Sequence, residues 1–123
     1  MSATPRAREL ALAAAVAAQD KLAKEVLALD VTSQLALTDV FVIASAPSER
    51  QVSAVVDAVE ERLHTLGSKP LRREGQREGR WVLLDFGDIV VHVMHEEDRE
   101  FYDLERLWKD CPPIELPDAD PDD

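Results

Sequence analysis

Apolar side chains recur with a helical period in two parts of the first half of the chain. Between Arg6 and about Lys24, the content of alanine, leucine, lysine and glutamine favours a helix. A second helix should follow Ser48, a suitable N-cap with Gln51 at the capping-box position. Valine and leucine then recur at spacings of three and four as far as Gly67, a residue type that commonly ends helices. The pattern predicts two helices, of which the second is strongly amphipathic.

Two apolar runs between these helices predict strands. Residues 25–31 are rich in branched side chains and end in an acidic and polar turn, which favours a strand. A first helix that continues to Leu29 is the other reading of the same residues. Residues 38–46 form a more continuous apolar run, as expected for a central strand that is covered on both faces.

The segment from Trp81 to Met94 has the pattern of a β-hairpin, after a short basic strand or edge within residues 69–75. Gly87 and Asp88 can form its tight turn, because glycine readily adopts the positive φ that such turns require. The two strands must then be antiparallel. Side chains of the first strand alternate between two faces, one with Trp81, Leu83 and Asp85 and the other with Val82, Leu84 and Phe86.

An aromatic and acidic helix should complete the fold. It begins near Glu96 and runs to Trp108 or Lys109, because the following prolines cannot continue a helix. A helical wheel places four side chains on its core side: Phe101, Leu104, Leu107 and Trp108. The element order α-β-β-α-β-β-β-α predicts an α/β fold with a mixed sheet of about five strands and flanking helices.

Length and composition limit the organisation of the chain and its partners. The 123 residues fit one domain, residues 1–110, followed by a disordered Pro/Asp-rich acidic tail, residues 111–123. A formal charge of −11 repels phosphates, so we expect no extensive direct binding of nucleic acid. Cys111 has no disulfide partner, which fits the cytoplasm. The alanine-rich first segment is too short to span a bilayer, so we expect no membrane partner.

Several polar residues could be combined into a catalytic centre. His92, His95 and Glu96 could ligate a metal, but strand residues three apart point to opposite faces and no fourth ligand is evident. Asp85 and Asp88 could hold magnesium, yet the chain lacks a glycine-rich loop with a lysine that would bind phosphate. We therefore predict no catalysis, no metal and no cofactor. A metal-dependent nucleotidyltransferase or phosphohydrolase that uses Asp85, Asp88 and His92 is the alternative.

Trp81 is the strongest candidate for a recognition residue. Tryptophan buries a large rigid surface and keeps a polar N–H, which suits both a core and an interface. Both readings of Trp81 are open, and its neighbour Asp85 on the same strand face favours the interface.

Residues 81–108, WVLLDFGDIVVHVMHEEDREFYDLERLW, with TDVFVIASAPSERQVSAVVDAV at 38–59, resemble the ribosomal silencing factor (Iojap-like) family. The resemblance covers roughly Arg8 to Trp108. It implies a nucleotidyltransferase-related fold without catalysis. It also implies a translation repressor that binds the large ribosomal subunit through its fourteenth protein (uL14 family). Such a protein blocks association with the small subunit when nutrients are scarce, and it is a homodimer when free.

The same resemblance implies a partner-binding surface on the hairpin and the last helix, with Trp81 as its anchor. The acidic composition suits such a partner, because charge complementarity assists docking on basic ribosomal proteins. The implied surface comprises Trp81, Asp85, Glu96, Arg99, Tyr102, Glu105 and Trp108.

Overall fold

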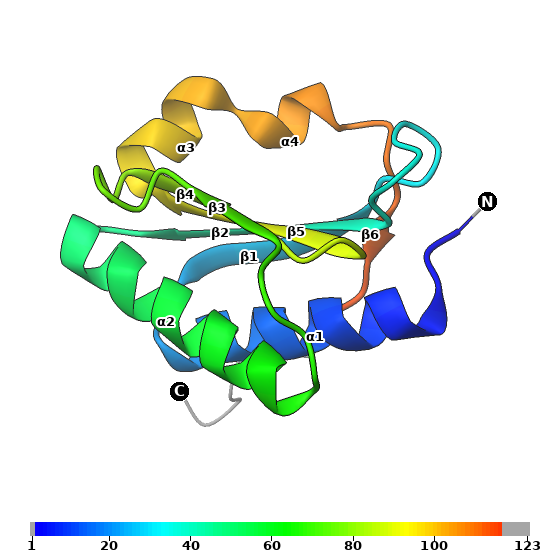
Figure 1. Cartoon of the computed structure of the whole chain (residues 1–123). Coiled ribbons are helices and arrows are strands. Elements are labelled where there is room, and N and C mark those ends of the chain that lie inside the picture. The colour runs from blue at the N-terminus through cyan, green and yellow to red at the C-terminus, as the bar shows by residue number, and fades with distance from the viewer. Residues whose placement is uncertain (1, 117–123) are drawn as a thin grey trace.

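The computed structural model describes residues 2–116. Figure 1 labels the helices and strands in chain order. They are α1 (Pro5–Asp20), β1 (Lys24–Asp30), β2 (Val40–Ala46), α2 (Glu49–Thr65), β3 (Arg72–Glu74), β4 (Trp81–Asp85), β5 (Ile89–His95), α3 (Glu96–Tyr102), α4 (Leu104–Leu107) and β6 (Pro113–Ile114).

The strands of residues 2–116 form one six-stranded mixed sheet in the order β3-β4-β5-β2-β1-β6. The central pair β2 and β5 is parallel, and every other neighbouring pair is antiparallel. Helices α1 and α2 cover one face of the sheet, while α3 and α4 lie over the other (Figure 1). The predicted α/β class with a mixed sheet is confirmed, and the sheet has six strands where about five were expected.

The local signals in the first half of the chain are largely confirmed. The Oγ atom of Ser48 accepts a hydrogen bond from the backbone N–H of Gln51 at 3.1 Å and so caps α2. Helix α1 ends at Asp20, earlier than expected, and Leu22 follows with a φ of +62°. Residues 25–31 are therefore mainly strand, and the reading in which the first helix continues to Leu29 is wrong.

The expected start of the acidic tail at residue 111 is wrong. Cys111 and Ile114 are buried, and β6 pairs with β1 through the register of Ile114 opposite Ala28. The backbone N–H of Asp30 also donates to the carbonyl of Pro112 at 2.8 Å. This short apolar segment adds the sixth strand because it can bury side chains and also pair with backbone hydrogen-bonding groups at the edge of β1. The rest of the predicted tail, residues 117–123, lies outside the described residues.

The single last helix expected over residues 96–108 is interrupted. Asp103 adopts the left-handed conformation with φ +47° and ψ +58°, which ends α3 and starts α4 in a new direction. Because the helix is interrupted there, a wheel drawn for one continuous helix wrongly places Phe101 and Leu107 on the core side. Phe101 is 80% exposed and Leu107 is 72% exposed. Leu104 is buried as expected, and Trp108 is half-buried.

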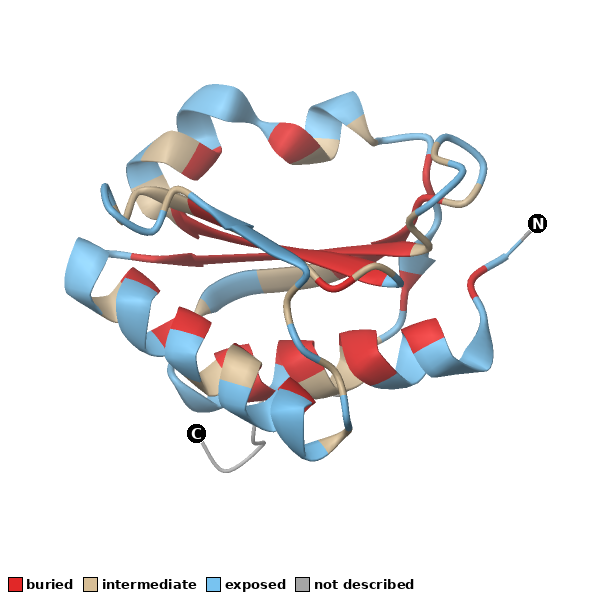
Figure 2. Cartoon of the chain, in the orientation of Figure 1, coloured by how far each residue is buried: buried red, intermediate tan, exposed pale blue. Residues whose placement is uncertain are grey.

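Buried residues lie on both faces of the sheet (Figure 2), and they form two apolar clusters. Below β2 and β5, alanines of α1 such as Ala11, Ala14 and Ala18 are fully buried, and their small side chains let the helix approach closely. The other layer is richer in large side chains and includes Phe41, Met94 and Leu104. In the described part of the chain, no helix combines the length and apolar character needed to cross a membrane.

Candidate binding surface

Six rings form a continuous series of contacts between the sheet and the layer of α3 and α4. We call them the aromatic cluster: Phe41, Trp81, His92, Phe101, Tyr102 and Trp108. Adjacent ring centroids lie 4.9 to 6.0 Å apart along this series. Phe101 is mostly exposed, whereas Phe41 is buried, so the cluster runs from the surface of α3 into the core. Such offset and edge contacts stabilise aromatic pairs beyond the area that they bury.

Trp81 holds the central place in this cluster. Its ring centroid lies 5.0 Å from that of Tyr102 at the end of α3, and its side chain is half-buried. Arg80 fixes the neighbouring backbone, because its guanidinium donates to Asp98 of α3 at 2.7 Å and to Glu97 at 3.0 Å. The start of β4 is therefore tied to the first turn of α3. This tie places Trp81 beside Tyr102.

His92 lies beneath Trp81 on the same face of the sheet. The backbone register pairs His92 with Leu83, two positions along β4 from Trp81. The indole Nε1 of Trp81 donates a hydrogen bond to Nδ1 of His92 at 3.1 Å. Burial lowers the pKa of His92 to about 4, so the imidazole is neutral at pH 7. Because Nδ1 accepts, the proton of the neutral ring is on Nε2, and this buried atom has no hydrogen-bond partner in the described part of the chain.

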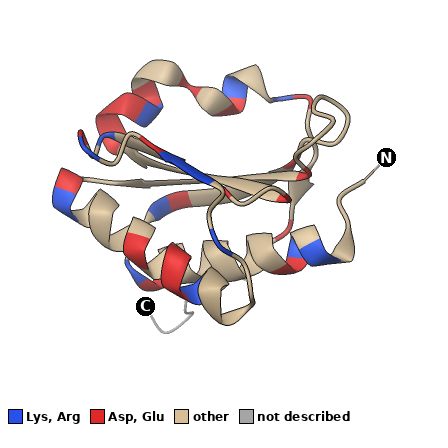
Figure 3. Ribbon diagram, viewed as in Figure 1, with Lys and Arg blue, Asp and Glu red and all other residues tan. Residues whose placement is uncertain are grey.

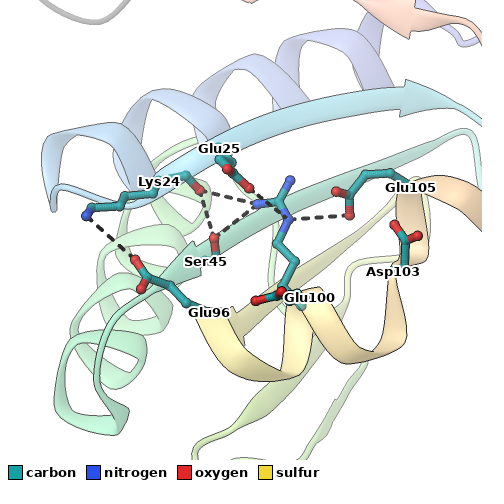
Figure 4. Close-up of a pocket in the computed structure, with 8 residues that line it drawn as sticks. Lys24, Glu25, Ser45, Glu96, Glu100, Asp103 and Glu105 are labelled. Carbon is teal, nitrogen blue, oxygen red and sulfur yellow. Dashed lines mark hydrogen bonds and ion pairs between the residues drawn. The ribbon is translucent and has the colours of Figure 1, made fainter.

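Next to the aromatic cluster, a pocket of about 530 Å³ opens between α3, α4 and the start of β1 (Figure 4). Arg99 lies at its base and is only 4% exposed. Its Nη1 donates to the carbonyl of Lys24 at 3.3 Å and to Oγ of Ser45 at 3.2 Å. Its Nε donates to Glu105 at 3.3 Å. We call this the Arg99 pocket, lined by Lys24, Glu25, Ser45, Glu96, Arg99, Glu100, Asp103 and Glu105.

The Arg99 pocket has an acidic rim. Five of its lining residues are Asp or Glu, against Lys24 and Arg99. Glu96 lies 3.7 Å from the Lys24 ammonium, and Glu25 lies 3.9 Å from Nε of Arg99. Figure 3 shows Asp and Glu concentrated on the first part of α3, while β3 at the sheet edge is basic. This part of the surface is suited to a partner that presents positive charge.

The structure divides the seven predicted site residues into three sets. Trp81, Tyr102 and Trp108 belong to the aromatic cluster, although Trp108 contacts it from the far side through Phe41. Three others line the Arg99 pocket: Glu96, Arg99 and Glu105. Tyr102 and Arg99 are on the same short helix, so the two sets are neighbours.

Asp85 is separate from both sets. It ends β4, about 13 Å along the strand from Trp81. Its Oδ1 accepts from the backbone N–H of Gly87 at 2.9 Å, and its Oδ2 lies 3.9 Å from Arg72. These contacts stabilise the hairpin turn and the edge strand, so the structure gives Asp85 a local role.

Two members of the cluster, His92 and Phe41, are absent from the binding surface that the sequence predicts. The sequence offers His92 only as a strand residue, a metal ligand or a member of a catalytic centre, and Phe41 only as part of a central strand. The hairpin turn at Gly87 and Asp88 does fix which residues face each other, because Phe86 and Ile89 close it with a 2.9 Å hydrogen bond. Counting back from that turn places His92 on the face that carries Trp81. The contact of Phe41 depends on the parallel pairing of β2 and β5, for which the chain gives no local signal.

The residues of the catalytic alternative do not form a site. His92 is 5% exposed and its Nδ1 is occupied by Trp81, whereas Asp88 is on the exposed turn. Asp85 is engaged by the turn and by Arg72. Within residues 2–116, no group of three His, Cys, Asp or Glu side chains could hold a metal ion.

Comparisons with known proteins agree with this architecture. The family model described as "Ribosomal silencing factor during starvation" matches residues 4–123. A ribosomal silencing factor of Bacillus subtilis is 41% identical over 103 residues, which cover 84% of this chain and 87% of that protein. A crystal structure from Chromobacterium violaceum superposes with a TM-score of 0.80 at 34% identity and covers 93% of this chain and 95% of that one.

A more distant relative in mouse is named "Mitochondrial assembly of ribosomal large subunit protein 1". It is 34% identical over 89 residues, which cover 70% of this chain and 39% of that protein. The family match over nearly the whole chain, the identity to the bacterial relatives and the shared fold agree with one another. This chain belongs to the ribosomal silencing factor family.

Proposed function

We propose that this protein binds the large ribosomal subunit through its fourteenth protein, of the uL14 family, and blocks association with the small subunit. Translation is thereby repressed when nutrients are scarce. The protein acts by occupying a surface and catalyses no reaction. Its site of action is the cytoplasm, where subunits join.

One observation carries this proposal: an exposed aromatic edge lies next to an acidic pocket on the same helix. Tyr102 is 48% exposed and packs on Trp81, while Phe101 beside it is 80% exposed. The residues that dominate the binding energy of protein interfaces are enriched in tryptophan, tyrosine and arginine. The acidic rim of the Arg99 pocket complements a basic ribosomal protein and speeds encounter with it. The name of the mouse relative refers to the same ribosomal subunit.

We also propose that the free protein is a homodimer and that dimerisation competes with ribosome binding. Phe101 and Leu107 are largely exposed apolar side chains on the outside of α3 and α4. Exposed apolar surface of this kind favours association. A second copy that covers it would also cover Tyr102, so the two partners would exclude each other.

Co-sedimentation with isolated ribosomal subunits tests the proposed binding. The wild-type protein should pellet with large subunits and not with small subunits. Trp81→Ala should weaken large-subunit binding about thirtyfold, or about 2 kcal/mol, while the fold survives. Val16→Ala is the matched control, because Val16 is a half-exposed apolar side chain on α1, across the sheet from the aromatic cluster. Undiminished binding by a folded Trp81→Ala protein would remove Trp81 from the surface, and absence of wild-type binding would refute the proposal.

A further inference from the structure

His92 is an unusual residue for its position. It is the one polar side chain among six consecutive buried residues of β5, Ile89 to Met94. Within residues 2–116, its Nε2 has no hydrogen-bond partner. A buried donor without a partner is uncommon and destabilises a folded protein, and an aliphatic side chain at this place would avoid that cost. The presence of an imidazole here therefore needs a compensating role.

The contacts of His92 indicate what this role is. Nδ1 is the acceptor for the indole N–H of Trp81 at 3.1 Å. The imidazole also makes an edge-type ring contact with Phe41, with ring centroids 4.9 Å apart, and Phe41 packs against Trp108. His92 is thus a rigid support held in the core, and it offers one acceptor to a side chain that is itself half-exposed.

We propose that His92 is a positioning residue that holds the indole of Trp81 in the orientation required by the partner. The inference rests on the proposed function, because it assigns Trp81 to the binding surface. A tryptophan that is already oriented loses less side-chain freedom when it binds than one that must be ordered by its partner. The hydrogen bond also fixes which edge of the indole is turned inward, so that the rest of the ring, next to Tyr102, is presented outward.

Two substitutions at residue 92 distinguish the effect of the hydrogen-bond acceptor from the effect of side-chain size. His92→Leu keeps an apolar body of similar size and removes the acceptor. His92→Asn keeps an acceptor, because the amide oxygen can take the place of Nδ1. We expect His92→Leu to weaken large-subunit binding roughly three- to tenfold, the range for loss of one hydrogen bond. We expect His92→Asn to bind within about twofold of wild type.

The indole N–H resonance of Trp81 in a proton–nitrogen correlation spectrum reports the hydrogen bond directly. It is assigned by its loss in Trp81→Phe. The resonance should move upfield in His92→Leu and keep its downfield position in His92→Asn. If His92 only stabilised the fold, the position of the Trp81 resonance in each variant would not follow that variant's affinity for large subunits. Thermal unfolding of each variant establishes that the binding is compared between folded proteins.

A double-mutant cycle with Trp81→Phe provides the decisive comparison. Trp81→Phe removes the donor and keeps a ring, so it should lose the same hydrogen bond as His92→Leu. In the Trp81→Phe background, His92→Leu should cause no further loss of binding. If His92→Leu does not fold, His92→Asn, which keeps the hydrogen bond, is compared with Trp81→Phe, which loses it. His92→Asn should then keep the resonance and the binding, and Trp81→Phe should bind more weakly.

Three results would overturn the inference: wild-type binding by His92→Leu, failure of folded His92→Asn to keep the resonance and the binding, or full additivity in the cycle. Failure of the proposed function would look different. The wild-type protein would then not bind large subunits at all. The spectra would still show whether His92 holds Trp81.

Discussion

Nη1 of Arg99 donates a hydrogen bond to Oγ of Ser45 at 3.2 Å, and this contact joins α3 to the central strand β2. Ser45 also donates from its Oγ to the carbonyl of Lys24 on the neighbouring strand β1, at 3.1 Å. Arg99 therefore reaches two strands at once. A seven-residue helix cannot be stable alone, so its position depends on contacts of this kind.

Arg99 should matter more for stability than the carboxylates around it. Arg99→Ala is expected to lower the free energy of unfolding by about 3 kcal/mol, because it removes a buried cation with hydrogen bonds to Ser45 and Lys24. Glu25→Gln should change it by less than about 0.5 kcal/mol, since Glu25 is largely exposed. Urea unfolding of both variants checks the order. Equal losses of unfolding free energy in the two variants would contradict the importance of the hydrogen bonds from Arg99 to Ser45 and to the Lys24 carbonyl.

Gly75 and Gly79 form a matched pair before β4. A Cβ at Gly75 would overlap the carbonyl oxygen of Trp81, and φ there is +81°. At Gly79, with φ +70°, the nearest atom to an added Cβ is 3.5 Å away. Gly79→Ala should cost about 1 kcal/mol from the backbone conformation alone. Gly75→Ala should cost at least about 2 kcal/mol and shift the fluorescence of Trp81. Equal destabilisation in thermal unfolding would show that the loop relaxes away from Trp81.

Asp103 carries the left-handed turn between α3 and α4 without a side-chain capping bond of its own. Asp103→Gly should therefore raise the free energy of unfolding by about 0.5 kcal/mol, because glycine adopts this conformation without steric cost. Asp103→Ala should lower it by about 1 kcal/mol. Urea unfolding distinguishes them. Stabilisation by alanine would mean that the two short helices merge into the single helix that the sequence pattern predicts.

The burial of His92 makes stability depend on pH. Its pKa is about 4 in the folded protein, against about 6.5 in the unfolded chain, so the unfolded chain binds more protons between these values. The part of the stability that depends on a neutral His92 is fully present above about pH 6.5 and is lost as the pH falls towards 4. Relative to His92→Asn, the wild-type protein should lose about 2 kcal/mol between about pH 7 and pH 5. Parallel pH profiles of the two proteins in urea unfolding would refute this assignment.

The sequence pattern predicts most of the fold because its signals are local. Ser48 and Gln51 define the start of α2, and the alternation after Trp81 correctly separates the two faces of β4. The break at Asp103 was not predictable in the same way. Helical periodicity continues through the segment, and aspartate is compatible with both a helix surface and a left-handed turn.

The candidate site was predictable only in part, because its parts meet through pairing across the sheet. The family resemblance places Arg99 on the binding surface, yet its side chain is buried and reaches Ser45, which is 54 residues away in the chain. The last strand, β6, falls within the predicted tail because its two residues, Pro113 and Ile114, carry almost no strand signal. The contacts that gather Trp81, Tyr102 and His92 follow from the hairpin turn and from the direct succession of β5 and α3.

The most direct test of the central claim is a subunit-joining assay. Large subunits are incubated with this protein, small subunits are then added, and the intact ribosomes are measured by light scattering and on sucrose gradients. We expect the wild-type protein to block joining and Trp81→Ala at the same concentration to restore most of it, while Val16→Ala should block as wild type does. Normal joining on large subunits saturated with the wild-type protein would refute the proposed function.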